Sequence, residues 1–274
     1  MLTPRSKKPP RGLISKWNSL VNIIQPLDKV VVAFSGGLDS SLLLAAAVFT
    51  LGTQRVRAVT CTGPLSPPWE LQVARSGARA LGVSHTEVEA HELDDPRIAA
   101  NTEMRCYWCK RRRMQLLLDM AGDWVVVEGT HVGDEPSQRP GIRALKELGV
   151  LSPLTQAQLS KPELAKLARW LGIGWAVRPS GACLATRIPT ATPLTLQALQ
   201  RVARAEGAVR ELVGERVQVR VREHWPVARV ELGVGGLRIL ASGSRRAKLV
   251  EALKAAGYRR VCLDLEGYQE GGGS

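Results

Sequence analysis

The 274-residue sequence has few acidic side chains, few cysteines and no long apolar run. Its 25 Asp and Glu residues stand against 38 Lys and Arg residues, which leaves a formal net charge of +13. Such an excess favours anionic partners: nucleotides, phosphorylated small molecules or nucleic acid. No apolar run approaches the roughly 18 residues that cross a bilayer, and the basic, proline-rich start lacks the apolar core of a signal peptide. We therefore expect a cytoplasmic protein with no membrane partner.

The five cysteines are an odd number in a chain of this length and do not resemble a disulfide framework. In a reducing compartment they are free, catalytic or bound to metal. The four histidines, His85, His91, His131 and His224, show no metal-ligand spacing, and we expect them at the surface or in loops. No internal repeat is visible.

One segment predicts a phosphate site. An apolar run from Val30 to Phe34 leads into S-G-G-L-D-S, and an apolar, helix-like stretch follows. Gly36 and Gly37 permit close approach of backbone N–H groups to an anion, while Asp39, Ser40 and Ser41 occupy positions typical of helix caps. The segment has neither the lysine of G-x-x-x-x-G-K-[ST] nor the third glycine of G-x-G-x-x-G. It resembles the PP-loop of ATP pyrophosphatases, which implies transfer of AMP rather than of the γ-phosphate.

Strand-like and helix-like segments alternate after this loop. The extended segments are expected at 56–60, 83–88 and 124–128, and the helices at 69–81 and 109–121. This order predicts an α/β fold with a doubly wound parallel sheet, whose strand ends at Phe34, Thr60 and Glu128 face one crevice. Ser160 begins a capping box that opens a helix to about Leu171.

A smaller α+β domain is expected beyond a segment rich in Pro, Gly and Thr. Its helices are predicted at 195–206 and 244–256, and its extended segments at 217–222, 228–232 and 260–265. The chain is longer than one ordinary domain. We divide it into an N-terminal arm and helix (1–28), a PP-loop domain (29–180) and a C-terminal domain for substrate binding and oligomerisation (181–274).

Three cysteines form the second informative pattern. Cys106 and Cys109 are spaced C-x-x-C in R-C-Y-W-C-K, at the start of a helix, and Cys183 lies in A-C-L-A-T-R. Three thiolates on a 4Fe-4S cluster leave one iron open, whereas structural zinc takes four ligands. Cys61 could complete a zinc site, so both metals remain open at this point. Cys262, in R-V-C-L-D, is expected to be a core residue.

Together these motifs resemble the LarE-type ATP-dependent sulfur transferases. The resemblance rests on S-G-G-L-D-S, R-C-Y-W-C-K, E-G-T (128–130) leading through Asp134 to R-P-G-I-R-A (139–144), S-P-L (152–154), the Cys183 segment and D-L-E-G-Y (264–268). It covers nearly the whole chain and implies the conversion of a carboxylate of pyridinium-3,5-biscarboxylic acid mononucleotide to a thiocarboxylate, for the nickel-pincer cofactor. ATP first adenylates the carboxylate, and a sulfur nucleophile then attacks.

The resemblance also implies the residues of the site. ATP and Mg²⁺ are bound by Ser35, Gly36, Gly37, Asp39, Ser40, Thr60, Gly129 and Thr130. The mononucleotide is bound by Thr186, Arg187, Glu206, Arg220 and Arg222, and the catalytic residues are Asp39, Cys183 and Arg187. Cys106, Cys109 and Cys183 ligate a 4Fe-4S cluster in one branch of the family, whereas in the other branch the residue matching Cys183 gives up its own sulfur. The C-x-x-C pair places this chain in the cluster branch.

The alternatives are a tRNA thiolase with the same loop, an ammonia-dependent AMP-forming synthetase, and a non-catalytic scaffold that carries a cluster. The segment before the PP-loop is too short for an RNA-binding module, so we do not expect a nucleic-acid partner. A synthetase would leave the three cysteines without a role. We expect sulfide or another sulfur donor as co-substrate and, from the resemblance, a homohexamer.

Overall fold

The computed structural model describes residues 8–134, 140–178, 181–214, 217–240 and 242–269. The chain divides into two compact units that interleave along the sequence. The first unit comprises Met1–Gly63, Pro68–Glu92 and Cys106–Gly181, and the second comprises Pro64–Pro67, Leu93–Arg105 and Ala182–Ser274. The predicted boundary at residue 180 falls on Ser180, which lies outside the described residues, and the three-part division stays a prediction.

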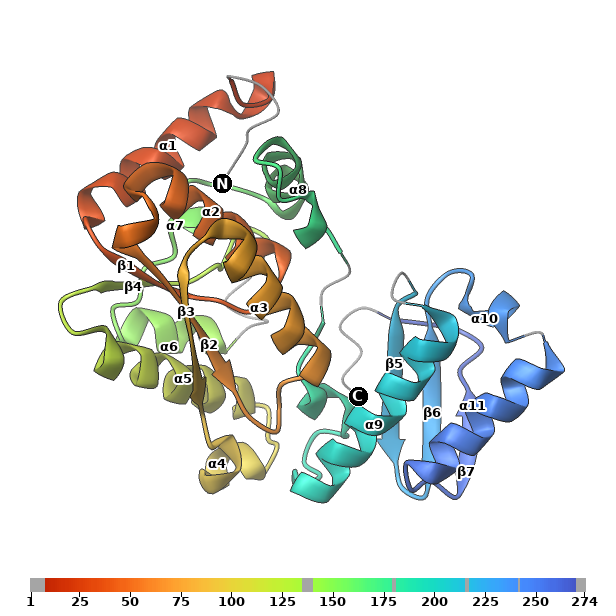
Figure 1. Cartoon of the computed structure of the whole chain (residues 1–274). Helices are drawn as coiled ribbons and strands as arrows, with labels where there is room; N and C mark the ends of the chain where they lie inside the picture. Colours follow the sequence, from red (N-terminus) through yellow and green to blue (C-terminus); the bar gives the residue numbers. More distant parts are fainter. Residues whose placement is uncertain (1–7, 135–139, 179–180, 215–216, 241, 270–274) are drawn as a thin grey trace. The chain divides into compact units, whose positions relative to one another are not determined.

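The first unit is built on a four-stranded parallel sheet with the order β3-β2-β1-β4 (Figure 1). Its strands are β1 (Val30–Ala33), β2 (Val56–Thr62), β3 (Ser84–Glu89) and β4 (Val125–Val127). Val30 pairs with Val56 on one side and with Val125 on the other, so the β-branched run of β1 occupies the centre of the sheet. This confirms the predicted doubly wound α/β fold.

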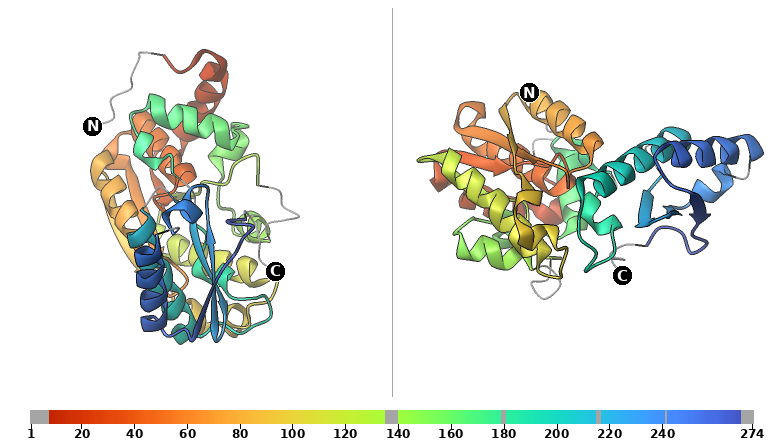
Figure 2. Two further views of the ribbon diagram at one scale, coloured as in Figure 1. Left: turned by 90° about the vertical axis from the view of Figure 1, so that its right-hand side faces the viewer. Right: turned by 90° about the horizontal axis from the view of Figure 1, so that it is seen from below.

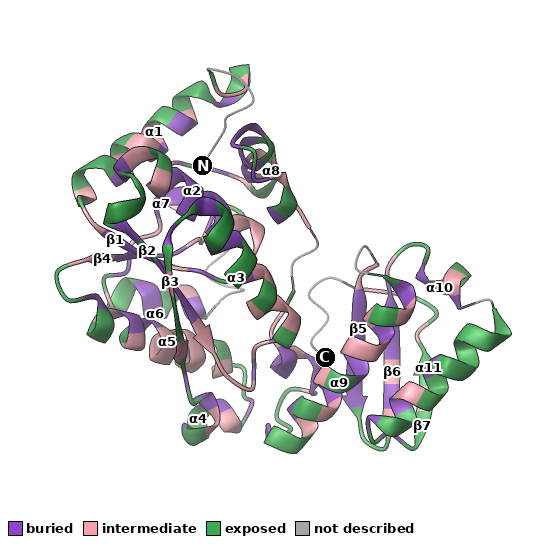
Figure 3. Ribbon diagram, in the orientation of Figure 1, coloured by how far each residue is buried: buried purple, intermediate pink, exposed green. Residues whose placement is uncertain are grey.

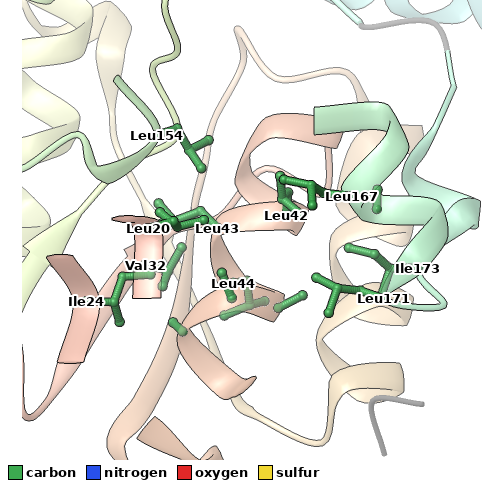
Figure 4. Packing of buried hydrophobic residues seen from close by; sticks show 14 of the residues in the cluster. Leu20, Ile24, Val32, Leu42, Leu43, Leu44, Leu154, Leu167, Leu171 and Ile173 are labelled. Carbon is green, nitrogen blue, oxygen red and sulfur yellow. The ribbon is translucent and has the colours of Figure 1, made fainter. Parts of the chain in front are cut away.

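Helices cover both faces of this sheet, as two views of the ribbon show (Figures 1 and 2). One face carries α1 (Ile14–Ile24), α2 (Leu38–Leu51), α3 (Pro68–Leu81) and α8 (Lys161–Trp170), and the other carries α5 (Arg105–Ala121) and α6 (Gly141–Glu147). The short helix α7 (Pro153–Gln156) contacts α1. Residues 42–47 of α2 are all buried (Figure 3), and Leu42, Leu43 and Leu44 pack between α1 and α8 (Figure 4). This central helix is therefore fixed on several sides, and the loop at its N-terminus has a rigid base.

The second unit contains a three-stranded sheet with the order β5-β6-β7. The strands β5 (Val219–His224) and β6 (Val227–Leu232) are antiparallel, and β7 (Arg260–Leu263) runs parallel to β6. The helices α9 (Leu196–Val213) and α11 (Gly243–Ala255) pack on one face through a core that includes Val219, Val221 and Leu253 (Figures 1 and 2). Two short helices, α4 (Pro96–Ala99) and α10 (Gly236–Ile239), complete this unit.

Most expected elements are present, with boundaries shifted by a few residues. The largest differences are α5, which begins at Arg105 rather than Cys109, and α9, which extends to Val213 rather than Glu206. The expectation for Cys262 was wrong: it is exposed, because β7 is an edge strand whose residues lie mostly at the surface. No helix among the described residues is long and apolar enough to cross a membrane.

Candidate functional site

The loop between β1 and α2 has the geometry of an anion site. Gly36 has a φ of +74°, and a Cβ there would lie 2.7 Å from the backbone nitrogen of Ala74 in α3. Only glycine satisfies both conditions. The loop ends at the N-terminus of a helix of 14 residues, where backbone N–H groups and the helix dipole favour a phosphate.

Two serines close this loop. The backbone N–H of Ser35 donates to Oγ of Ser40 at 3.2 Å, and the two hydroxyl oxygens lie 3.1 Å apart. The N–H of Gly37 donates to Oγ of Ser35 at 3.3 Å. The expected capping positions were wrong: Gly37 is the N-cap, and Asp39, Ser40 and Ser41 lie inside α2. Their side chains therefore belong to the first helical turn.

A second loop packs against this turn from the end of β4. A Cβ on Gly129 would lie 3.0 Å from the backbone nitrogen of Ser40. Glu128, which is 3% exposed, accepts hydrogen bonds from the N–H of Thr130 at 2.9 Å and the hydroxyl of Ser152 at 2.6 Å on Oε1. Its Oε2 accepts from the hydroxyl of Thr130 at 2.9 Å. The carboxylate thus sets the shape of the predicted Gly129–Thr130 loop beside the phosphate loop.

His131 lies beside two carboxylates at the same place. It belongs to a loop, as expected, but is only 5% exposed. Its Nδ1 accepts the N–H of Gly133 at 3.0 Å, so a neutral ring carries its proton on Nε2. That nitrogen lies 4.0 Å from Oδ2 of Asp39 and 3.8 Å from Oδ1 of Asp134. Carboxylate oxygens are ligands that Mg²⁺ prefers, so the donor set here suits a metal–phosphate complex.

The C-x-x-C pair lies on the first turns of α5. Cys106 is exposed and Cys109 is partly exposed, and neither forms a disulfide. Residues three positions apart share one side of a helix, so a single ligand can reach both. Arg139 of the R-P-G-I-R-A motif lies outside the described residues, but Gly141 packs on this turn: its Cβ would lie 3.4 Å from the carbonyl oxygen of Cys106.

The four cations after Cys109 hold α5 in place. Four consecutive residues fan around a helix, and here each has a different partner within the first unit. Lys110 pairs with Glu128 at 3.4 Å, Arg111 with Glu147 at 3.1 Å, Arg112 with the carbonyl of Ala90, and Arg113 with the fully buried Glu92. The run is therefore not a solvated face, and Lys110 links the cysteine helix to the carboxylate that shapes the Gly129–Thr130 loop.

Cys61 lies close to this helix. Its thiol donates to the carbonyl of Arg113 at 3.8 Å. Burial raises the pKa of the Cys61 thiol and Glu92 adds to this, while Arg113 and Lys110 oppose it. The neutral thiol is therefore favoured, which is typical of a packed cysteine rather than of a thiolate ligand.

Cys183 precedes a short 3-10 helix, Leu184–Arg187, in the second unit. Its carbonyl accepts from the hydroxyl of Thr186 at 2.9 Å and from Nη1 of Arg187 at 3.2 Å. Arg187 is 3% exposed and forms a two-bond ion pair with Glu206, at 2.6 and 3.0 Å. Burial lowers the pKa of Arg187, but the Glu206 carboxylate raises it more, so the ion pair is retained. These bonds fix the backbone of Cys183 and leave its thiol partly accessible.

Arg220 and Arg222 lie on the face of β5 opposite the helices, and each is 4% exposed. Arg222 donates to Glu231 at 2.7 Å and to the carbonyl of Thr186 at 2.8 Å. Arg220 donates to the carbonyl of Gln269 and the hydroxyl of Tyr268, each at 2.9 Å. The alternation of these two arginines along the strand suits either a solvated face or an anion site. The solvated face is wrong, because both side chains are buried.

The charge around Arg220 is incompletely balanced. Burial lowers the pKa of Arg220, and the nearby cations Arg187 and Arg222 lower it further, while Tyr268 and Glu231 oppose them. Its Nε atom is buried and has no hydrogen-bond partner among the described residues. A buried guanidinium with an unused donor is suited to bind an anion such as a phosphate or carboxylate.

The predicted site residues therefore fall in two places. The first unit contains the expected ATP site and the cysteine pair: the phosphate loop, Thr60, the Gly129–Thr130 loop, Cys106 and Cys109. The second unit contains the third cysteine and the expected mononucleotide site: Cys183, Thr186, Arg187, Glu206, Arg220 and Arg222. Sequence reasoning missed Glu128, Lys110 and His131 as site residues, although the first two stand inside the motifs E-G-T and C-x-x-C-K. Among the described residues, no group of three or more His, Cys, Asp or Glu side chains is arranged to hold a metal ion.

Comparison with known proteins extends these observations. The profile of the asparagine synthase family matches residues 27–102. An uncharacterized protein of Synechocystis sp. is 37% identical over 262 residues, which cover 94% of this chain and 97% of that protein. The pyridinium-3,5-bisthiocarboxylic acid mononucleotide synthase of Lactiplantibacillus plantarum is 33% identical over 265 residues, 94% of each chain. An uncharacterized protein of Methanocaldococcus jannaschii is 27% identical over 247 residues.

Proposed function

Because this chain belongs to the same family of PP-loop ATP pyrophosphatases as pyridinium-3,5-bisthiocarboxylic acid mononucleotide synthase, we propose that it is an AMP-forming sulfur transferase acting on pyridinium-3,5-biscarboxylic acid mononucleotide. The product is a thiocarboxylate for the nickel-pincer cofactor. The observation that carries this proposal is similarity over 94% of both chains together with an intact phosphate loop.

In the first step a substrate carboxylate oxygen attacks the α-phosphorus of ATP. The new O–P bond forms as the bond to the β-phosphate oxygen breaks, and pyrophosphate leaves. Ser35, Gly36, Gly37 and Ser40 bind the phosphates, and Thr60, Gly129 and Thr130 complete the nucleotide site. Asp39 would hold Mg²⁺. Backbone donors offset the charge that develops on the leaving pyrophosphate, and Mg²⁺ would add to this when bound.

In the second step a sulfur nucleophile attacks the carbonyl carbon of the acyl adenylate. A C–S bond forms, the C–O bond to AMP breaks, and AMP leaves with the electron pair. The thiols of Cys106, Cys109 and Cys183 form no disulfide and are at least partly accessible, so they suit thiolate ligands. They would hold a 4Fe-4S cluster, which supplies an open iron able to carry sulfide.

The second unit offers the mononucleotide anion a buried cationic face. Arg220 has an unused Nε donor, and Arg222 donates to the carbonyl of Thr186 in the Cys183 segment. We assign the substrate to Thr186, Arg187, Glu206, Arg220 and Arg222, with Arg187 also holding the carbonyl of Cys183.

The ATP half of the proposal is tested by the products of nucleotide cleavage. With the mononucleotide and Mg²⁺ the wild type is expected to release AMP and pyrophosphate, and Asp39→Asn to lose this activity. Asp119→Asn, at an exposed position of α5, is the matched control and should retain it. Release of ADP and orthophosphate by the wild type would contradict the proposal.

The cluster is tested by iron and sulfide content after anaerobic purification. Replacing Cys106, Cys109 or Cys183 by Ala should each lower bound iron, whereas Cys262→Ala, at an exposed thiol outside the motifs, should not. After turnover with a sulfide source the mass of the chain should be unchanged. Loss of hydrogen sulfide from Cys183 in step with product would instead identify a single-use sulfur donor.

A further inference from the structure

The residue that leads from β1 into the phosphate loop, Phe34, is held in place by side chains of β2 and β3. Phe34 follows β1 directly and precedes Ser35. Its N–H donates to the carbonyl of Val59 at 2.8 Å, and its carbonyl accepts the hydroxyl of Thr60 at 2.7 Å. If the parallel strand pairing continued, a backbone N–H would donate the hydrogen bond to the Phe34 carbonyl. The Thr60 side chain therefore replaces a ladder bond where the chain turns into the loop.

The direction of each hydrogen bond here follows from the chemistry of the groups. The carbonyl of Phe34 has no proton to give, so the Thr60 hydroxyl donates to it. The hydroxyl oxygen of Thr60 also lies 2.7 Å from Nε2 of His85. Because its proton is given to Phe34, this oxygen must be the acceptor in the bond to His85. His85 Nε2 therefore carries a proton, and the neutral ring is the Nε2–H tautomer.

The surroundings of His85 favour a fixed, neutral ring. It is half-buried on β3, opposite Ala58 in the register, and stands edge-on to the ring of Phe34 with centroids 6.1 Å apart. Burial lowers the pKa of His85, Glu87 opposes this, and Arg75 adds to it. The ring is thus held by a hydrogen bond to Thr60 on β2 and by an aromatic contact with Phe34, the residue before the loop.

This chain of bonds fixes the first peptide of the phosphate loop. The Phe34–Ser35 peptide is planar, so its carbonyl and its N–H move together. The carbonyl end is held by Thr60, and the N–H end donates to Oγ of Ser40 at 3.2 Å. Thr60 is only 7% exposed, so in the intact protein its hydroxyl oxygen depends on protein partners, Phe34 and His85, for its hydrogen bonds.

We propose that His85 is a positioning residue of the ATP site, which acts through Thr60 to fix the peptide that opens the phosphate loop. The inference rests on the proposed ATP-dependent function. His85 acts on affinity for the polyphosphate and not on the sulfur-transfer step. Through His85 the edge strand β3 also contributes to the shape of the ATP site.

The test is direct binding of Mg·ATP and Mg·pyrophosphate by calorimetry, with thermal unfolding measured alongside. We expect His85→Ala to raise both dissociation constants about 5- to 10-fold, the effect of losing one hydrogen bond. His85→Gln, whose amide can donate to Thr60, should recover most of the affinity. His91→Ala, at an exposed histidine nearby in sequence, is the matched control and should bind like the wild type.

Two further measurements separate positioning from mere packing. Thr60→Val should weaken binding, and adding His85→Ala to it should cost little more, because both changes break one chain of bonds. Nitrogen NMR of the wild type should report the Nε2–H tautomer of His85. The opposite tautomer, or wild-type affinity in His85→Ala, would overturn the inference while leaving ATP cleavage intact. A wild type that neither binds nor cleaves ATP would overturn the proposed function itself.

Discussion

At the scale of single residues, the two glycines of the phosphate loop have different roles. Gly36 has a φ of +74° and no room for a Cβ beside the backbone of Ala74, whereas Gly37 has a φ of −72° and its Cβ would lie 3.4 Å from Oγ of Ser35. The sequence predicts that both glycines matter. Only the backbone geometry shows which one is required for the shape of the loop.

Replacement by alanine should separate the two. Gly36→Ala is expected to lower the free energy of unfolding by more than about 1 kcal/mol, because an alanine in this region of φ is strained and its Cβ meets a backbone atom. Gly37→Ala should change stability by less than about half that amount. Denaturant unfolding of both variants measures the difference, and equal losses would contradict the assigned geometry.

Residue chemistry also explains what the sequence could not show. The alternation of Arg220 and Arg222 is compatible with a solvated face, but Arg220 is covered by residues distant in sequence, Tyr268 and Gln269, to which it donates hydrogen bonds. Of the two carboxylates beside His131, Asp134 is near in sequence, but Asp39 is brought to it by the fold. Long-range contacts of this kind leave no local pattern.

At the scale of elements, the capping box at the start of α8 was predicted and is present, and the structure adds a cation. Glu163 accepts from the N–H and hydroxyl of Ser160, each at 2.8 Å, and pairs with Lys16 of α1 at 2.8 Å. Burial raises the pKa of Glu163, but Lys16 and Ser160 lower it more, to about 2. The carboxylate therefore joins the end of one helix to the side of another.

This pKa predicts a pH dependence of stability. A carboxyl group whose pKa falls on folding stabilises the protein above its ordinary pKa of 4.5, and this contribution is lost as pH falls toward about 2. Glu163→Gln should therefore lower the free energy of unfolding by about 1 kcal/mol at pH 7, and the difference from wild type should shrink below pH 4.5.

Urea unfolding from pH 7 to pH 3 measures this difference. Glu251→Gln, at an exposed position of α11, serves as the matched control and should show no such trend. The free energy of unfolding of Glu163→Gln and of the wild type could instead differ by the same amount at every pH. That result would show that the ion pair and the capping box do not depend on the charge of Glu163.

The partners of the four cations at 110–113 could not be predicted from the sequence. A run of like charges on a helix usually predicts a solvated face. In this structure each side chain has its own partner, and the fully buried Glu92 and nearly buried Glu128 are among them. The helix period predicts that the four residues point in different directions, but the partners come from α6 and from the segments after β4 and β3.

At the scale of the whole molecule, the order of strands and helices was enough to predict the parallel sheet, because β-branched runs separated by helices have few other solutions. The interleaving of the two units was not predictable in this way. Pro64–Pro67 and Leu93–Arg105 belong to the second unit, although each lies between segments of the first. Their own sequences resemble ordinary loops and carry no sign of a distant partner.

The similarity to the synthase covers 94% of both chains and extends through both units. The cysteine pair, Cys183 and the buried arginines therefore all lie within it. The net charge of +13 would also suit tRNA, but binding of tRNA would involve many phosphates and weaken steeply with salt, whereas a mononucleotide neutralises few charges. Homohexamer formation stays a proposal, which the mass of the protein in solution can decide.

The most direct test of the account is product analysis of the complete reaction. Anaerobic protein is incubated with Mg·ATP, pyridinium-3,5-biscarboxylic acid mononucleotide and a sulfide source, and the mononucleotide, AMP and pyrophosphate are measured together by mass spectrometry and enzymatic assay. The expected product is a mononucleotide in which sulfur replaces a carboxylate oxygen, with one AMP and one pyrophosphate formed for each sulfur transferred. Cleavage of ATP to ADP, or a mononucleotide left unchanged while thiolated tRNA accumulates in a parallel reaction, would contradict it.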